Sequence, residues 1–222
     1  MPAIVDLAQL AHFDLLATME PEDRQTVAKQ AKSLTLGRND IVFAEGDGAD
    51  DLFLVVSGRV GIVNISMDGR ESMVALIEPG DVFGEMALFE GGNRSAQARA
   101  LEATELIALP YETLREVFSS RPELLWRVVS LLVRRLRATD AALADTVFLD
   151  VPGRTAKRLL EIAGDDDEFV VPVTQEELAG LIGASRERVN KAIATFVRLG
   201  WMEPKERGYH IVDRNQLRRR ST

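Results

Sequence analysis

Residues 174–193 read TQEELAGLIGASRERVNKAI, a helix-forming run that one glycine divides in two. Thr174 and Glu177, three residues apart, form the capping-box pattern that begins a helix. Gly183 interrupts this helix after about two turns, and Ser185 is suited to cap a second helix. Two short helices around a turn that contains glycine are the signature of a helix-turn-helix.

The second helix, expected over residues 186–199, separates polar from apolar side chains. Polar residues at three- and four-residue spacing share one face of its first two turns: Arg186, Glu187, Asn190 and Lys191. Such a face suits the DNA major groove, where arginine or lysine binds guanine and glutamate accepts from cytosine. The alternative is a solvated face with an internal Glu187–Lys191 pair. The apolar residues of both helices are expected in a core: Leu178, Ile182, Val189, Ile193 and Phe196.

The residues around this motif extend the C-terminal domain. Residues 201–212, WMEPKERGYHIV, contain two short extended runs joined by a polar turn, which predicts a β wing. Upstream, a helix is expected over 154–163. The segment 150–153, DVPG, is expected to break the preceding helix and act as a hinge, because proline lacks an N–H and disfavours helical geometry before it.

Charge is distributed unevenly along the chain, whose formal net charge is −8. Residues 186–222 contain ten basic and four acidic residues and so carry +6, which leaves −14 for the remainder. The total alone argues weakly against nucleic acid, but the distribution is more informative. The basic C-terminal end is compatible with a DNA partner.

The segment from Ile41 to about Pro110 consists of short β-rich runs separated by turn residues. The Asp68-Gly69 dipeptide between two such runs is a strong hairpin signal. With Gly69 included, glycines recur at intervals of about 12 residues or less, as in a small barrel or sandwich with tight corners: Gly46, Gly58, Gly80 and Gly84. We expect an antiparallel β-barrel-like domain, preceded by short helices over residues 3–36.

Beyond Tyr111 the hydrophobic period changes from two to about 3.5, which predicts a long helix. A narrow apolar stripe follows this period: Leu125, Val128, Leu132, Leu136, Thr139, Leu143 and Thr146. Charged residues flank it: Arg134, Arg135, Arg137 and Asp145. A seam of this width favours a two-helix coiled coil and therefore a homodimer. The alternative is a helix packed on its own β domain.

Residues 83–96, FGEMALFEGGNRSA, form an apolar, turn-rich segment with a single cation, Arg94. A partly buried guanidinium without a counter-charge is costly, so a bound anion would explain it. The alternative is a structural salt bridge from Arg94 to Glu85 or Glu90. The isolated segment leaves both interpretations open.

These segments together resemble the Crp/Fnr family of bacterial transcription regulators, in its cyclic-AMP receptor branch. The resemblance covers nearly the whole chain and is most specific in three stretches: FGEMALFEGGNRSA, RRLRATDAALADTVFLDVPGR and GASRERVNKAI. The hinge and the Val189-Asn190-Lys191 portion look closest to actinobacterial members. The resemblance implies an α+β chain of three parts: a jelly-roll-like, cyclic-nucleotide-binding β-roll over 1–120, a long dimerisation helix over 121–149, and a winged helix-turn-helix over 150–222.

The resemblance implies cAMP as allosteric effector, without a metal. Arg94 would present its planar fork to the phosphate, Ser95 would add a hydroxyl, and Glu85 would accept from the ribose 2′-hydroxyl. Asp140 stands where serine or asparagine is usual, and its carboxylate could accept from adenine or from guanine, so cGMP stays an alternative. The full set assigned to the ligand is Gly84, Glu85, Met86, Arg94, Ser95, Arg135, Thr139 and Asp140.

Arg135 could pair with Glu85 and fix its orientation, the alternative being a solvated arginine. By resemblance, the base lies against Thr139 of one subunit and the second polar residue of the partner. Glycines without a Cβ would let backbone N–H groups approach the phosphate: Gly84, Gly91 and Gly92.

The resemblance also implies double-stranded DNA as partner. The residues assigned to it are Gln175, Ser185, Arg186, Glu187, Asn190 and Lys191. Two recognition helices in a two-fold dimer would meet half-sites about 34–36 Å apart, hence a pseudo-palindromic operator. A TGTGA-like half-site is implied, although Lys191 lacks the fork of the arginine common in enterobacterial members. RNA polymerase is a further expected partner.

Other functions are less well supported by the sequence. The chain has no cysteine, and its two histidines, His12 and His210, have no metal-ligand spacing. No nucleophile–base pair or paired catalytic carboxylates predict an enzyme. No signal peptide or membrane-spanning run is visible, so a cytoplasmic location without a membrane partner is expected. The remaining alternatives are a Crp/Fnr-type regulator with another or no effector, and a cyclic-nucleotide module that regulates a partner protein.

Overall fold

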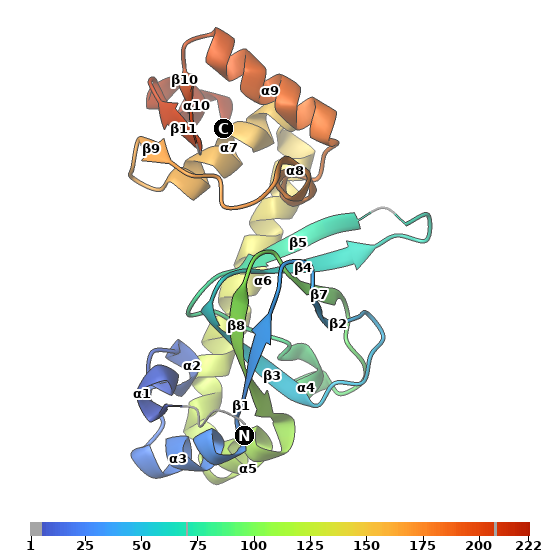
Figure 1. The fold of residues 1–222 in the computed structure, drawn as a ribbon, viewed down its shortest axis with the longest axis vertical. Helices are drawn as coiled ribbons and strands as arrows, with labels where there is room; N and C mark the ends of the chain where they lie inside the picture. The colour runs from blue at the N-terminus through green and yellow to red at the C-terminus, as the bar shows by residue number, and fades with distance from the viewer. Residues whose placement is uncertain (1–5, 70, 207) are drawn as a thin grey trace. The chain divides into compact units, whose positions relative to one another are not determined.

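The structure is a computed structural model that describes residues 6–69, 71–206 and 208–222. It divides into two compact units, Met1–Leu136 and Arg137–Thr222. Figure 1 shows the β-rich first unit, the mixed helical and β second unit, and the long helix in which the division falls. The α+β architecture expected from the sequence is confirmed.

Short helices flank the β part of the first unit. They are α1 (Leu7–Leu10), α2 (Asp14–Ala17), α3 (Pro21–Gln30), α4 (Met86–Glu90), α5 (Tyr111–Ser120) and the 3-10 turn η1 (Pro122–Leu124). The prediction of helices over residues 3–36 is wrong at its end, because Lys32–Leu36 is strand β1 and pairs with β8 (Thr104–Pro110). Pairing along a whole strand outweighed local helix preference there. Residues 3–5 of that prediction lie outside the described residues.

Two four-stranded antiparallel sheets form the β-roll, with orders β1-β8-β3-β6 and β2-β7-β4-β5. The remaining strands are β2 (Ile41–Phe43), β3 (Asp51–Ser57), β4 (Val60–Ile65), β5 (Glu71–Ile77), β6 (Val82–Phe83) and β7 (Gln97–Ala100). Asp68-Gly69 lies in the connection between β4 and β5, where Gly69 has a φ of 79°. This left-handed conformation explains the glycine.

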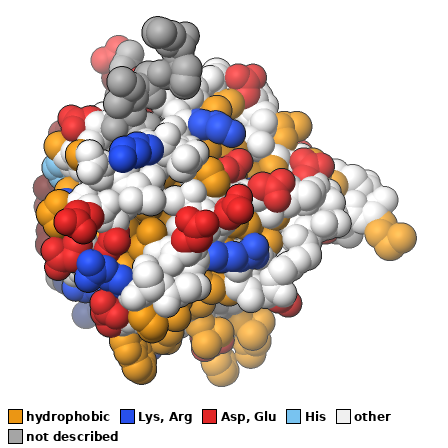
Figure 2. All heavy atoms as spheres, turned by 90° about the horizontal axis from the view of Figure 1, so that it is seen from below, with side chains coloured by type: hydrophobic (Ala, Val, Ile, Leu, Met, Phe, Trp, Pro, Cys, Tyr) orange, Lys and Arg blue, Asp and Glu red, His pale blue; other side chains and the backbone are white. Residues whose placement is uncertain are grey.

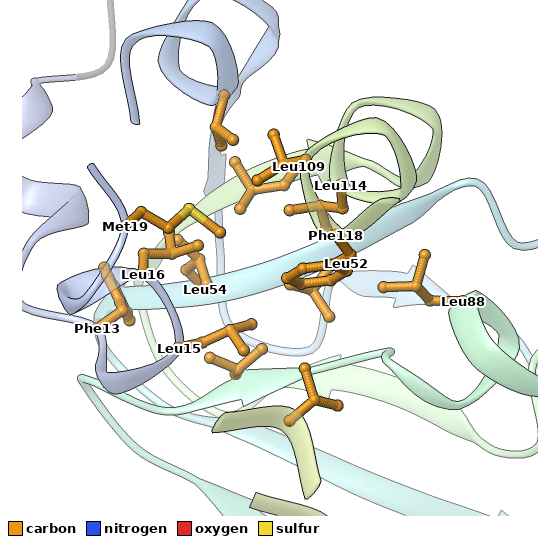
Figure 3. Packing of buried hydrophobic residues seen from close by; sticks show 14 of the residues in the cluster. Phe13, Leu15, Leu16, Met19, Leu52, Leu54, Leu88, Leu109, Leu114 and Phe118 are labelled. Atoms are coloured by element: carbon orange, nitrogen blue, oxygen red, sulfur yellow. The ribbon is translucent and has the colours of Figure 1, made fainter. Parts of the chain in front are cut away.

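Strand β3 is buried on both faces, because its alternate side chains enter two different cores. Leu52 and Leu54 pack with the N-terminal helices and α5, as Figure 3 shows. Phe53 and Val55 point to the other face and pack between the two sheets. The ring of Phe53 lies 5.2 Å from that of Phe83 and 5.7 Å from that of Phe43, so an aromatic cluster fills the inside of the roll.

Helix α6 (Leu125–Phe148) is continuous, but the burial of its apolar residues changes along its length. Val128 packs into the first unit's core, so the alternative of a helix packed on its own β domain describes its beginning. Farther along, large apolar side chains are exposed in the single chain: Val129, Leu132, Val133, Leu136, Leu143, Val147 and Phe148.

The second unit combines the end of α6 and several shorter helices with a small sheet. Its remaining elements are α7 (Val151–Ala163), β9 (Glu168–Phe169), α8 (Gln175–Ile182), α9 (Arg186–Arg198), β10 (Met202–Lys205), β11 (Gly208–Ile211) and α10 (Arg214–Arg220). The sheet has the order β10-β11-β9 and contains the expected wing. A single buried cluster joins α7, α8 and α9 to this sheet.

The helix break between α6 and α7 is shorter than the sequence predicts. Pro152 and Gly153 lie in the first turn of α7, and the break is limited to Leu149 and Asp150. Proline fits the first turn, where its missing N–H has no intrahelical partner anyway. Asp150 caps the helix by accepting from the Gly153 backbone N at 2.9 Å, and this bond lowers the pKa of the Asp150 carboxyl.

Candidate functional site

The segment 83–96 forms a strand, a short helix and two tight turns. β6 ends at Phe83, α4 begins at Met86, and the turn after α4 contains Gly91 and Gly92 with φ of 79° and 86°. Both conformations favour glycine. The backbone of Arg94 is then held by two hydrogen bonds, from its N to Asp47 O and from Gly46 N to its O, both 2.9 Å.

Gly84 permits the close approach of the Arg94 side chain. Its φ is 79°, and a Cβ at this position would lie 2.7 Å from Arg94 Nη1 and 3.5 Å from Asp51 O. The glycine is therefore required both by its backbone conformation and by the guanidinium beside it.

The Arg94 side chain is buried, with 7% exposed, and its guanidinium is oriented by three hydrogen bonds. Nη1 donates to Gly84 O at 3.1 Å and to the Tyr111 hydroxyl at 2.9 Å, and Nη2 donates to Asp51 O at 2.7 Å. The guanidinium carbon lies 4.2 Å from the centroid of the Phe43 ring, a cation–π distance.

The Arg94 charge has no counter-charge in the described part of the chain, since no ion pair forms there with Glu85, Glu90 or another carboxylate. A guanidinium has five N–H groups. Three are used, and Nε is buried without a hydrogen-bond partner. An unsatisfied buried donor costs about 1–3 kcal/mol, more when it is charged. The arrangement is therefore open to an anionic acceptor.

Glu85 is paired elsewhere, with Arg135 on α6. The side chain of Glu85 is only 6% exposed and forms an ion pair with Arg135 Nη1, while Arg135 Nη2 donates to Val82 O. The solvated alternative for Arg135 is not what the structure contains. This pair engages one of the two carboxylates that the sequence offered as partners of Arg94.

The other residues assigned to the ligand are placed differently. Ser95 is exposed, and its hydroxyl lies 3.4 Å from the sulfur of Met86, which is 52% exposed. Thr139 and Asp140 lie on α6 within the second unit. Their contact with a base stays a prediction.

Tyr111, Phe43 and the carbonyl of Asp51 were missed by the sequence interpretation. The Tyr111 hydroxyl accepts from Arg94 and donates to Gly84 O. Burial raises the pKa of Tyr111, so the hydroxyl stays protonated at neutral pH. Local sequence contains no signal for these contacts, because Tyr111 begins α5 and Phe43 and Asp51 come from β2 and β3.

The helix-turn-helix forms as expected. Both halves of the Thr174–Glu177 capping box are present, at 3.2 Å and 2.7 Å. Gly183 is left-handed, with φ of 67°, and the Ser185 hydroxyl accepts from the N of Arg188 at 3.4 Å. The apolar residues expected in the core are buried: Leu178, Ile182, Val189, Ile193 and Phe196.

The polar face of α9 is open to solvent. Its exposed residues are Arg186, Glu187, Arg188, Asn190 and Lys191. Among the described residues, Glu187 and Lys191 do not form the ion pair that was the alternative. Ser185 is exposed, and Gln175 is half-buried with a buried Oε1 that has no hydrogen-bond partner.

Acidic side chains are numerous on one face of the first unit (Figure 2). Figure 2 shows them on the face at the lower end of Figure 1, where α3 and α5 lie.

Among the described residues, no helix is both long and apolar enough to span a bilayer. The same residues contain no cluster of three or more histidine, aspartate or glutamate side chains suited to a metal ion.

Two family models match the chain. One, described as a cyclic nucleotide-binding domain, matches residues 33–121, and the other, described as a Crp-like helix-turn-helix domain, matches residues 153–220. A CRP-like cAMP-activated global transcriptional regulator of Mycobacterium tuberculosis is 37% identical over 219 residues, which cover 96% of this chain and 98% of that protein.

Two further proteins are similar over most of their length. The cAMP-activated global transcriptional regulator Vfr of Pseudomonas aeruginosa is 31% identical, over 92% of this chain and 95% of that protein. Among solved structures, the c-di-GMP responsive global regulator CLP of Xanthomonas campestris matches with a TM-score of 0.75 and 25% identity. That match covers 86% of this chain and 99% of the CLP chain.

Proposed function

The chain belongs to the Crp/Fnr family of transcription regulators, and on this premise we propose that it is a dimeric, cAMP-responsive member that binds a pseudo-palindromic operator. A regulator of the Crp type binds DNA and is not an enzyme. The effector, the site residues and the response to the effector are the proposed part.

The observation that supports the effector most is the buried Arg94 without a carboxylate partner. A cyclic nucleotide has one phosphate charge, and a guanidinium binds phosphate oxygens through parallel N–H bonds. Such a ligand would supply an acceptor for Arg94 Nε and compensate a charge that is costly to bury alone. The similar proteins of M. tuberculosis and P. aeruginosa are cAMP-activated regulators by name, which favours cAMP here.

The remaining ligand contacts follow from the residues around Arg94. Ser95 would add a hydroxyl to the phosphate, and Glu85, held by Arg135, would accept from the ribose 2′-hydroxyl. Thr139 and Asp140 would contact the base. Because a carboxylate accepts from adenine or guanine, cGMP is the second candidate. The backbone around four further residues would complete the site: Gly84, Met86, Gly91 and Gly92.

The operator contacts are proposed on the exposed face of α9. Arg186, Glu187, Asn190 and Lys191 would contact base edges in the major groove, and Gln175 and Ser185 would lie at the phosphates. The apolar stripe of α6 would pair with that of a second copy. Such a dimer would present two recognition helices to two half-sites.

The functional division that we propose is ligand binding over 1–120, dimerisation over 121–149 and DNA binding over 150–222. The nucleotide would shift the equilibrium between two states only by its differential affinity for them. RNA polymerase is the proposed protein partner. The protein would act in the cytoplasm.

Calorimetric titration of the full chain with cAMP, cGMP and c-di-GMP tests the effector. We expect cAMP to bind with a stoichiometry of about one per subunit, since each chain has one Arg94 site. The CLP regulator is described as responsive to c-di-GMP, so this dinucleotide is the informative competitor. Binding of c-di-GMP alone, or of none of the three, would overturn the effector while leaving the DNA-binding function.

Operator binding with and without saturating cAMP tests the response. The probe is a duplex with two inverted TGTGA-like half-sites, and we expect cAMP to tighten its binding. Equal affinity in both conditions would reject the response to cAMP. Failure to retain any duplex at low salt would instead favour a cyclic-nucleotide module that acts on a partner protein.

A further inference from the structure

Arg154, in the first turn of α7, is the residue that joins the helix break to the helix-turn-helix. Its Nη1 donates to Leu149 O at 2.8 Å. Its Nε donates to Ile182 O at 2.9 Å, and its Nη2 reaches Gly183 O at 3.3 Å. One guanidinium therefore bonds three carbonyls from two segments that are far apart in sequence.

These carbonyls lie where a helix leaves its backbone acceptors unpaired. Ile182 is the last residue of α8, and Gly183 is its left-handed cap. The last carbonyls of a helix have no intrahelical donor, and a cation is favourable at this end of the helix dipole. Arg154 supplies both the donors and the charge.

The turn held by Arg154 determines where α9 begins. Ser185, two residues after Gly183, is the N-cap of α9, and Arg186 is its first residue. The backbone of the turn is also held by bonds from Gly183 N to Gly180 O and from Ala184 N to Ala179 O, and Ile182 is buried in the core. A shift of this turn would therefore displace the exposed face of α9.

We propose that Arg154 is a positioning residue for operator recognition, which holds the helix-turn-helix turn to the carbonyl of Leu149 and does not itself contact DNA. Its donors face protein carbonyls, and its side chain is half-buried. The inference rests on the proposed operator contacts of α9. It does not depend on which effector the first unit binds.

The test compares the wild-type protein with Arg154→Gln and Arg154→Lys in the full chain. Affinity is measured for the duplex with inverted TGTGA-like half-sites and for a scrambled duplex, over a series of salt concentrations. We expect Arg154→Gln to lower operator affinity about 10-fold with little change on the scrambled duplex. The slope of log affinity against log salt should stay unchanged, because no phosphate contact is lost.

Arg154→Lys keeps the charge but not the planar guanidinium, so its operator affinity should lie between those of the wild type and Arg154→Gln. Circular dichroism shows whether each variant is folded. If Arg154→Gln does not fold, the affinity of Arg154→Lys for operator decides the test. The matched control is Arg158→Gln, one turn later on α7, whose side chain bonds Glu161 at 3.0 Å. It should bind operator as the wild type does.

The outcomes separate this inference from the proposed function. If the wild type prefers operator and both Arg154 variants match it, the inference is wrong and the function stands. A salt slope lower by about one per subunit would identify Arg154 as a phosphate contact instead. If the wild type binds the operator and scrambled duplexes equally well, the proposed operator contacts of α9 are wrong, and the inference about Arg154 is wrong with them.

Discussion

Arg94 in the β-roll and Arg186 on α9 are the same residue type in opposite settings. Arg94 is buried, stacked on Phe43 and held by three hydrogen bonds, whereas Arg186 is exposed on a helix surface. Its hydrogen bonds thus fix the orientation of the Arg94 guanidinium, and with it the direction from which the proposed ligand would bind. The direction of Arg186 is limited only by the helix that bears it.

This difference determines how each site should respond to change. A buried, oriented charge contributes through geometry, so small shifts of its supports should matter. An exposed charge contributes through its own contact with the partner. Removing that charge should therefore lower the binding affinity, whereas small shifts of neighbouring residues should not. Four substitutions test this contrast, in order of decreasing effect.

The largest effect is expected for Arg94→Gln. It removes the charge and the fork that we assign to the phosphate, so cAMP affinity should fall on the order of 100-fold, about 2.7 kcal/mol. Isothermal calorimetry measures it. Arg99→Gln is the matched control, since Arg99 lies five residues later on β7 and pairs with Glu71 at 2.9 Å. Equal losses in both variants would contradict a special role for Arg94.

Arg186→Ala should weaken specific operator binding by about 1–3 kcal/mol and leave cAMP binding intact. The measurement is a competition between operator and scrambled duplexes, followed by calorimetry with cAMP. Unchanged operator affinity would refute the base contact. Reduced cAMP affinity would show that the exposed face of α9 affects the first unit, and the two arginines would then not be independent.

Gly84→Ala should lower cAMP affinity about 10-fold, because the new Cβ would meet Arg94 Nη1 at 2.7 Å and displace the guanidinium. Gly80→Ala controls for backbone strain. Its φ is 93°, yet nothing lies within 4 Å of its Cβ. Both variants should lose about 1 kcal/mol of stability in thermal unfolding. If Gly80→Ala weakened cAMP binding as much, strain and not displacement of Arg94 would be the cause.

Tyr111→Phe should lower cAMP affinity about 5-fold by removing one acceptor from Arg94. If Tyr111 acts through Arg94, the same change should have no further effect in an Arg94→Gln background. A full, additive loss in that background would show that Tyr111 affects cAMP binding independently of Arg94. Tyr209→Phe, in the wing, is the control and should bind cAMP normally.

Parts of the fold could be predicted from the sequence because their signals are local. The Thr174–Glu177 box, Gly183 and Ser185 each act on the backbone within a few residues, and all three appear as expected. The same holds for Asp68-Gly69 between β4 and β5. These features depend on dihedral preferences and capping bonds that any flanking chain would allow.

Two predictions were wrong in part, one because of a strand partner distant in sequence and the other because of a local helix cap. Lys32–Leu36 is a strand because β8, about 70 residues later, provides its hydrogen bonds. The predicted helix break after α6 is present, but it is shorter than expected, because Asp150 caps α7 and Pro152 lies in the first turn of that helix. In both cases the local pattern was compatible with two structures.

The sequence by itself determined the order of β-roll, long helix and helix-turn-helix, the single cation of the segment 83–96 and the basic C-terminal end. Only the tertiary structure decided that Glu85 pairs with Arg135 and that Arg94 is held by Tyr111, Gly84 and Asp51. The physical reason is that a guanidinium can pair with any carboxylate or carbonyl within reach. Which acceptors are within reach depends on how strands and helices distant in sequence pack together.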